Sequence, residues 1–191
     1  EVFVAGGTGG ETMTLHLNSG SKLTTFSGTN IQAGGHLALD NAVLDTQYLD
    51  LRPGSSFSGS GALRTGSGTI AGQVENLGTF AVGHGVGTLE IMGRYINAAA
   101  GTIQFDLFGQ TAGSLYDQLL VDGTVALAGT LQVALDSGYQ PVQGTEFTLM
   151  TSTEGIAGTF DSLLLPTGYD WQINYNEFDV VLSVLSLATA L

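Results

Sequence analysis

Carboxylates and histidines are the side chains of this sequence whose types and spacing could support chemistry. Asp40, Asp45 and Asp50 lie five residues apart in "LDNAVLDTQYLD". A ladder of carboxylate oxygens could bind Ca²⁺, which prefers oxygen ligands. Neither an EF-hand loop nor a glycine-rich calcium repeat accompanies these aspartates, so solvated turn carboxylates are the favoured interpretation. We predict no resident metal ion and keep these three residues as weak metal candidates.

The three histidines, His16, His36 and His84, lie far apart in the sequence. If strands stack on one another, His16 and His36 could reach one face and offer imidazole ligands to a metal. Outward polar positions on strands or turns explain the same residues without a metal, and this interpretation is favoured. We predict no cofactor.

The sequence predicts no enzyme and no catalytic residue. The GxSxG, HExxH and P-loop patterns are absent. A glycosidase needs two carboxylates about 5–10 Å apart, and 17 acidic residues on an elongated fold meet that distance by chance. A lyase acting on uronates needs a cationic base or clamp, for which the candidates are Lys22, Arg52, Arg64 and Arg94.

Two further aspartates in "YDQLLVDG" are interpreted as turn residues. Asp117 is expected to order a turn by accepting hydrogen bonds from backbone N–H groups, as aspartate commonly does. Asp122 precedes Gly123, a pair typical of tight turns.

The charge of the chain excludes several classes of partner. Seventeen acidic residues against four Lys plus Arg give a net charge of −13, so no basic patch can neutralise phosphates. Nucleic acid, anionic lipid and tightly bound polyanionic glycans are therefore not expected. The apolar segment "FDVVLSVLSLATAL" has 14 residues, too few for a spanning helix, and no signal peptide begins at Glu1.

Alternation of apolar and polar residues predicts an all-β fold. No window shows a sustained helical period, and the 29 glycines supply corners between short strands. The side chains expected to face inward are Met13, Leu15, Leu17, Leu37, Leu39, Leu49, Leu51, Ile103, Phe105, Leu107, Val125, Leu127, Leu131, Val133, Leu135, Phe147, Leu149, Trp171, Ile173, Tyr175, Phe178, Val180, Leu182 and Val184.

Two all-β architectures fit this pattern, a sandwich or barrel and a parallel β-solenoid. Residues 12–108 favour the solenoid, because their apolar residues come singly or in pairs, as a narrow core requires. From Asp117 the strands lengthen and aromatic residues gather, which indicates a capping section. We expect one continuous elongated domain, with solenoid coils over residues 1–113 and the capping section over residues 114–191.

The sequence resembles a family of bacterial surface proteins. The resemblance rests on four segments, "GSGTIAGQVENLGTFAVGHGVGTLEIMGRYINAAAGTIQFDLFG", "YDQLLVDGTVALAGTLQVAL", "GTEFTLMTSTEGIAGTFDSLLLP" and "WQINYNEFDVVLSV". Together they look like the passenger region of bacterial autotransporters and the related solenoid regions of PEP-CTERM-type surface proteins, over residues 37–185. The resemblance implies a right-handed parallel β-helix, export, and a role at or beyond the cell surface. The turn that often reads "PG" in these proteins reads "VGHG" at residues 82–85.

These observations predict a non-enzymatic exported structural protein, secreted or held at the cell surface or in the matrix. Proteins of this family usually continue into a membrane barrel or a sorting tail, and residues 1–191 contain neither, so we expect an anchor that is missing, cleaved, or replaced by another mode of attachment. The apolar termini "EVFVAGG" and "FDVVLSVLSLATAL" indicate self-association end to end into filaments by strand addition. An adhesin or glycan-binding passenger domain, with a surface glycan or protein as partner, is the alternative, and a β-helix polysaccharide-degrading enzyme is less favoured.

Overall fold

Strands form all the regular secondary structure in the computed structural model, which describes residues 2–4, 12–67, 70–83 and 85–187. They assemble into a seven-stranded sheet and a curled 14-stranded sheet. The predicted all-β class is confirmed. Within these ranges there is no helix with the length and apolar character needed to cross a membrane.

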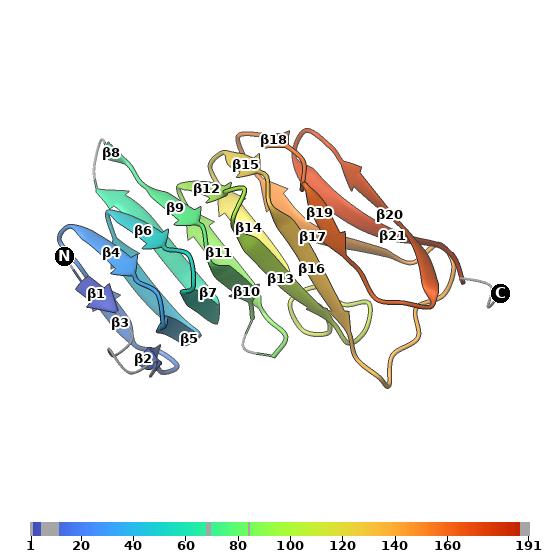
Figure 1. Cartoon of the computed structure of the whole chain (residues 1–191), viewed down its shortest axis with the longest axis horizontal. Helices are drawn as coiled ribbons and strands as arrows, with labels where there is room; N and C mark the ends of the chain where they lie inside the picture. Colours follow the sequence, from blue (N-terminus) through green and yellow to red (C-terminus); the bar gives the residue numbers. More distant parts are fainter. Residues whose placement is uncertain (1, 5–11, 68–69, 84, 188–191) are drawn as a thin grey trace.

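The seven-stranded sheet, here called wall A, consists only of parallel pairs (Figure 1). Its strands are short because each ends at a corner where the chain leaves for the next wall. In spatial order they are β1 (Val2–Val4), β4 (Gly28–Ile31), β6 (Tyr48–Leu51), β9 (Gln73–Asn76), β12 (Arg94–Asn97), β15 (Val125–Leu127) and β18 (Ile156–Gly158).

The 14-stranded sheet forms two further walls because two of its strands, β5 (Gly35–Thr46) and β7 (Ser56–Ser67), bend in the middle. Their first halves lie in wall B with β2 (Met13–Leu17), β10 (Thr79–Val82), β13 (Thr102–Leu107), β16 (Thr130–Leu135) and β19 (Ser162–Leu164). Their second halves lie in wall C with β3 (Lys22–Thr24), β11 (Thr88–Met92), β14 (Gln118–Asp122) and β17 (Glu146–Ser152). The short strand β8 (Ile70–Ala71) pairs antiparallel with the end of β7.

The backbone at the two bends explains why the strands can turn there. Asn41 has a φ of 46° and Gly61 a φ of 111°, both in the left-handed region. Asparagine tolerates that region better than most residues with a side chain, and glycine adopts it freely. A Cβ atom at Gly61 would lie 2.2 Å from the carbonyl oxygen of Ala42 on the neighbouring strand, so only glycine fits that corner.

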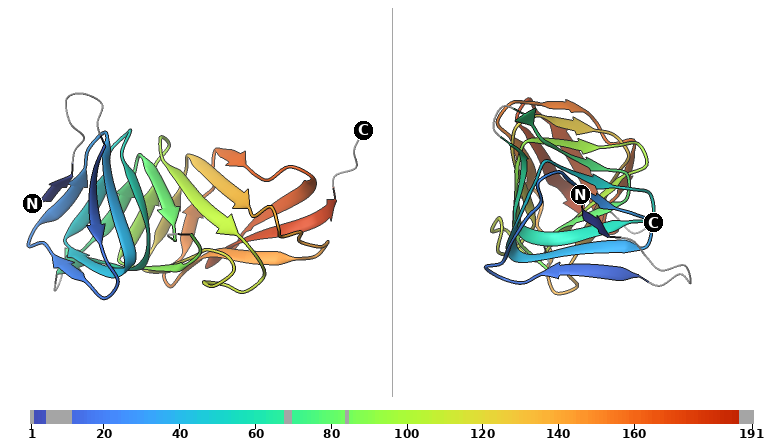
Figure 2. Two further views of the ribbon diagram at one scale, coloured as in Figure 1. Left: turned by 90° about the horizontal axis from the view of Figure 1, so that it is seen from below. Right: turned by 90° about the vertical axis from the view of Figure 1, so that its left-hand side faces the viewer.

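The chain crosses walls A, B and C in turn, and each crossing of all three, here called a circuit, stacks on the one before it (Figure 2). Thr29 in wall A pairs with Leu49, 20 residues later, and Val125 pairs with Ile156, 31 residues later. Circuits of unequal length therefore keep one register, since extra residues enter only at the corners. The molecule is elongated along the stacking direction (Figures 1 and 2).

The core lies between the three walls and is built from ladders of inward side chains. In wall B one ladder contains Leu37, Phe57, Phe80, Ile103 and Leu131, all almost fully buried. The rings of Phe57 and Phe80 stack with centroids 4.4 Å apart. Burying one such side chain stabilises the fold by about 1.5–3 kcal/mol, so the predicted alternation is what holds the walls together.

Several residues predicted to face inward are exposed or only half buried, and they lie near the ends of the stack. Met13 is 56% exposed and Phe178 47% exposed, so these two predictions are wrong. Met13 starts β2, which pairs on one side only among the described residues, and Phe178 lies in the turn before β21. Half-buried positions are Leu15, Leu17, Leu135, Trp171, Ile173 and Tyr175.

The C-terminal end of wall C departs from parallel pairing. β21 (Asp179–Leu187) pairs antiparallel with β17 on one side and with β20 (Tyr169–Tyr175) on the other. The prediction that this apolar segment presents an open strand edge is therefore wrong for the described residues, because β20 occupies that edge. Residues 188–191 lie outside the described residues.

Introducing the same charge at two adjacent positions of β16 tests the register. Val133 is buried and Gln132 faces outward, where its side-chain carbonyl accepts a hydrogen bond from Gln104. Val133→Asp should lower the free energy of unfolding by more than about 4 kcal/mol, because it buries an unpaired charge. Gln132→Asp should change it by less than about 1 kcal/mol. Denaturant unfolding measures both, and equal effects would contradict the assigned register.

Candidate functional site

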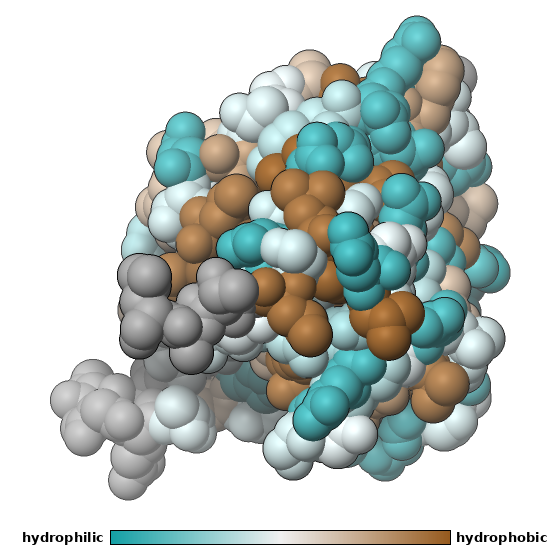
Figure 3. Space-filling model, turned by 90° about the vertical axis from the view of Figure 1, so that its right-hand side faces the viewer, coloured by the Kyte–Doolittle hydropathy of each residue, from teal (hydrophilic) through white to brown (hydrophobic). Residues whose placement is uncertain are grey.

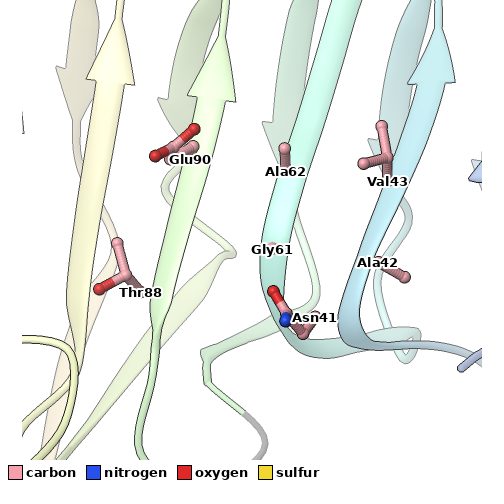
Figure 4. Close-up of a pocket in the computed structure, with 7 residues that line it drawn as sticks. All are labelled: Asn41, Ala42, Val43, Gly61, Ala62, Thr88 and Glu90. Carbon is pink, nitrogen blue, oxygen red and sulfur yellow. The ribbon is translucent and has the colours of Figure 1, made fainter. Parts of the chain in front are cut away.

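A hollow on the outer surface of wall C lies beside the two bends and is the first candidate site (Figure 4). It has a volume of about 320 Å³. The bends form one side of it, since the backbone turns away from the surface there, and β11 forms the other. The lining residues are Asn41, Ala42, Val43, Gly61, Ala62, Thr88 and Glu90.

The side chains of this hollow limit its chemistry. Among the described residues of the lining, Glu90 is the only ionisable one, beside the amide of Asn41 and the hydroxyl of Thr88. Acid–base catalysis of the glycosidase type needs a second carboxylate across the site, and the lining does not supply one. The small side chain of Ala62 and the bare backbone of Gly61 leave this surface shallow.

A second hollow of about 300 Å³ continues along wall C from Glu90. Asp122 is its other carboxylate, and it accepts a hydrogen bond of 3.0 Å from the hydroxyl of Thr153. In the register of β11 and β14, Leu120 pairs with Glu90 and Met92 pairs with Asp122, so acidic and apolar side chains alternate on this surface.

The structure does not bring Asp40, Asp45 and Asp50 together. Asp40 lies at the bend of β5, Asp45 in the second half of β5 within wall C, and Asp50 in β6 of wall A. Asp45 forms an ion pair of 2.7 Å with Lys22, and Asp50 one of 3.2 Å with Arg52. In a parallel stack, neighbours come from successive circuits rather than from residues five apart. Among the described residues no cluster of three or more His, Asp or Glu side chains could hold a metal ion.

The histidines partly follow the expectation. His36 pairs in register with Thr14, two residues before His16, so both histidines lie on the outer face of wall B. The imidazole of His36 contacts two serines of the next strand, with Nδ1 2.8 Å from the Ser56 hydroxyl and Nε2 3.2 Å from the Ser58 hydroxyl. These contacts assign His36 a role in joining strands. His84 lies outside the described residues.

Asp117 carries a buried carboxyl group that connects two backbone segments at a corner of the chain. Its Oδ1 accepts a hydrogen bond of 2.8 Å from the N–H of Gly87, and its Oδ2 one of 2.7 Å from the N–H of Asp106. The prediction that Asp117 orders a turn through backbone N–H groups is confirmed. Burial raises the pKa of Asp117 to about 8, against the opposing effect of the two N–H donors. Burial also raises the pKa of Asp106.

Buried asparagines form a ladder that the sequence interpretation missed. Asn76 and Asn97 occupy the same inward position of wall A in successive circuits. The Asn76 side-chain N–H donates to the Asn97 carbonyl oxygen over 2.8 Å, and the Tyr95 hydroxyl donates to the same oxygen over 3.1 Å. Asn97 also donates to the backbone oxygen of Ala128 over 2.7 Å. The sequence signal that could have indicated this ladder is an asparagine at the end of both β9 and β12, followed within a few residues by a glycine at a corner.

Comparison with known proteins assigns no function to these features. No protein-family model matches the chain, and no curated protein matches it significantly.

Removing divalent cations should leave the fold unchanged, because the three candidate aspartates lie apart and two of them pair with cations of the chain. The melting temperature should agree within about 1 °C in EDTA and in millimolar Ca²⁺, since a ligand of the folded state would raise it. Differential scanning calorimetry measures both conditions. A rise with Ca²⁺ that EDTA reverses would contradict the assignment of these residues to solvent and ion pairs.

Asp117 should make stability depend on pH. The unfolded chain releases this proton near pH 4, whereas the folded protein retains it up to about pH 8. The free energy of unfolding should therefore fall as the pH rises through this window.

Asp117→Asn should remove most of that dependence and lower stability by about 1–3 kcal/mol, because the amide oxygen can accept from one of the two backbone N–H groups while the amide nitrogen, itself a donor, leaves the other unsatisfied. Urea unfolding at a series of pH values measures both effects, and Asp122→Asn serves as the exposed control. A variant at Asp117 that keeps the full pH dependence would contradict the role given to its burial.

Proposed function

We propose that this protein is a non-enzymatic, exported structural protein that forms a right-handed parallel β-helix and self-assembles end to end by strand addition. The stacking of parallel circuits in three walls supports the β-helix. The resemblance to autotransporter passengers and PEP-CTERM-type surface proteins supports its handedness, export, and a place at the cell surface or in the extracellular matrix.

The observation that carries the proposal is that strands at both ends of the molecule have an unpaired edge among the described residues. β1, β2 and β3 each pair on one side only among the described residues, and so do β18, β19 and β20 at the opposite end. In walls A and B all the pairs are parallel, so β1 and β2 of one copy can extend the walls that end at β18 and β19 of another. Such a contact joins two different surfaces, and its repetition gives an open filament.

The composition of these edges favours association. Strands β1, β2, β18 and β19 contain no Asp, Glu, Lys or Arg, the charged residues that commonly protect sheet edges. Exposed apolar side chains lie on them, including Phe3 and Met13 at one end and Leu163 and Leu164 at the other. Figure 3 shows apolar surface on the C-terminal end of the molecule.

The inward-facing side chains of the first circuit are also incompletely buried. Its inward side chains Val2, Leu15 and Leu17 are only half buried, whereas Leu37 and Leu39 in the second circuit are fully buried. A further strand from another copy would remove the remaining apolar surface from water, which contributes about 25 cal/mol per Å².

The outer surface supports a structural role more than an enzymatic one. The hollow at the bends contains a single carboxylate, and Asp117 is committed to two backbone N–H groups inside the protein. Incubation with a polysaccharide panel tests this part, and reproducible depolymerisation would contradict it.

A charge placed on one terminal strand should block assembly. Met13→Lys puts a cation on the open edge of β2, while Met92→Lys puts the same residue on β11, which is paired on both sides. Wild type and Met92→Lys should form particles whose mass grows with concentration, and Met13→Lys should stay monomeric, because edge lysines oppose strand pairing.

Size-exclusion chromatography with light scattering and negative-stain microscopy measure the outcome. A wild-type protein that remains monomeric at every concentration would overturn the assembly proposal, as would equal assembly of both variants.

A further inference from the structure

Two adjoining hollows lie near the C-terminal end, on both sides of Tyr169. One has a volume of about 410 Å³ and the other about 340 Å³, and Gln140 and Tyr169 line both. The larger hollow also includes Asp136, Tyr139 and Thr167. We call the two hollows together the tyrosine groove. Their combined size accommodates two or three six-membered rings, within the usual range of small-ligand sites.

The aromatic residues of the tyrosine groove are held in place by their neighbours. Tyr169 contacts the ring of Trp171, with centroids 5.4 Å apart. The indole N–H of Trp171 donates to the backbone oxygen of Pro166 over 2.8 Å, which fixes the segment that precedes Tyr169. Tyr139 meets Phe147 edge to face, with centroids 6.4 Å apart. The groove therefore does not need to order its aromatic side chains on binding, and this lowers the entropic cost.

The loop on the other side of the groove is ordered by hydrogen bonds of its own. The Asp136 carboxylate accepts a hydrogen bond of 2.9 Å from the N–H of Gly138, and the backbone oxygen of Asp136 accepts one of 3.0 Å from the N–H of Tyr139. This turn places Tyr139 beside the exposed amide of Gln140. Aromatic rings and amide groups thus converge from two segments distant in sequence.

We propose that the tyrosine groove binds a neutral oligosaccharide. A pyranose ring has an apolar C–H face, which packs on an aromatic ring, and a rim of hydroxyls, which bond to amides, carboxylates and hydroxyls. Tyr169 supplies the ring, and Gln140, Gln143, Asp136 and Thr167 supply the polar partners.

The charge of the groove favours neutral glycans over anionic ones. Asp136 lies in the groove, no Lys or Arg lines it, and the whole chain has a net charge of −13. A polyanionic glycan would meet repulsion without a compensating cation. A neutral sugar meets none.

This site goes beyond the proposed structural role, although it shares Tyr169, the first residue of β20, with the terminal strands. Its lining does not include the terminal strands β18 and β19. Loss of assembly and loss of sugar binding are therefore separable, and binding is measured on the monomeric Met13→Lys protein.

The single tryptophan of the chain provides the readout, because Trp171 contacts Tyr169. Cellotetraose, xylotetraose and maltotetraose serve as neutral probes and tetragalacturonate as the charged probe, each titrated while tryptophan fluorescence is recorded. At least one neutral probe should give a saturable change and the charged probe none. No response to any neutral probe, or a response to tetragalacturonate alone, would overturn the proposal.

Variants then locate the binding. Tyr169→Ala should weaken the binding of the responding probe by about tenfold, and Tyr169→Phe should retain it, since the ring remains. Gln140→Ala, an exposed change that leaves the fold intact, should also weaken it measurably by calorimetry. Phe26→Ala removes an aromatic side chain that is 92% exposed near the other end, and it should bind as the parent does. Equal affinity of Gln140→Ala, Tyr169→Ala and Phe26→Ala would exclude the tyrosine groove.

Discussion

Parallel strands stacked in register impose one constraint on the whole molecule. Each inward-facing side chain lies directly against the side chain at the equivalent position of the next circuit. A side chain there must pack against its counterparts above and below, or bond to them. Leu37, Phe57 and Phe80 satisfy the constraint by packing. Gly59, two residues after Phe57, leaves room for Leu39 of the circuit before, because a Cβ at this position would lie 2.6 Å from the Leu39 Cβ.

Several buried polar residues lie where a corner leaves backbone groups without strand partners. Asn97 bonds to the backbone oxygens of Gly101 and Ala128, which belong to corners of two successive circuits. Thr46 receives a hydrogen bond of 2.7 Å from Thr25 and donates to the backbone oxygen of Tyr48 at the next corner. Asp117 performs the same function with its two oxygens. An unsatisfied buried polar group costs about 1–3 kcal/mol, so these side chains decide where the chain can turn.

The sequence predicts the strands well because alternation is a local property. The inward positions of β6, β13 and β17 follow from their own residues, and the role of Asp117 follows from the known preference of aspartate for backbone N–H groups. The bends that carry β5 and β7 from wall B into wall C could not be predicted, since they depend on left-handed backbone at Asn41 and at Gly61, one glycine among 29. The pairing of β21 with β20 and the tyrosine groove were also missed, because both depend on contacts between segments that the local pattern does not specify. Asp40, Asp45 and Asp50 do not form a ladder for the same reason. Which residues become neighbours across strands depends on the number of residues in each circuit, and not on a spacing of five.

The distribution of charge connects the two proposals. Acidic residues such as Glu75, Glu90 and Asp122 lie on the outer faces of the walls, while the terminal strands of walls A and B contain none. Side-to-side contact between copies therefore meets repulsion that salt screens, whereas end-to-end contact depends on backbone hydrogen bonds and apolar area, which salt affects little. A filament built in this way remains a single file of molecules. Each copy would add one tyrosine groove at a constant spacing, so weak binding of one sugar segment would become strong binding of a long neutral polymer through effective concentration.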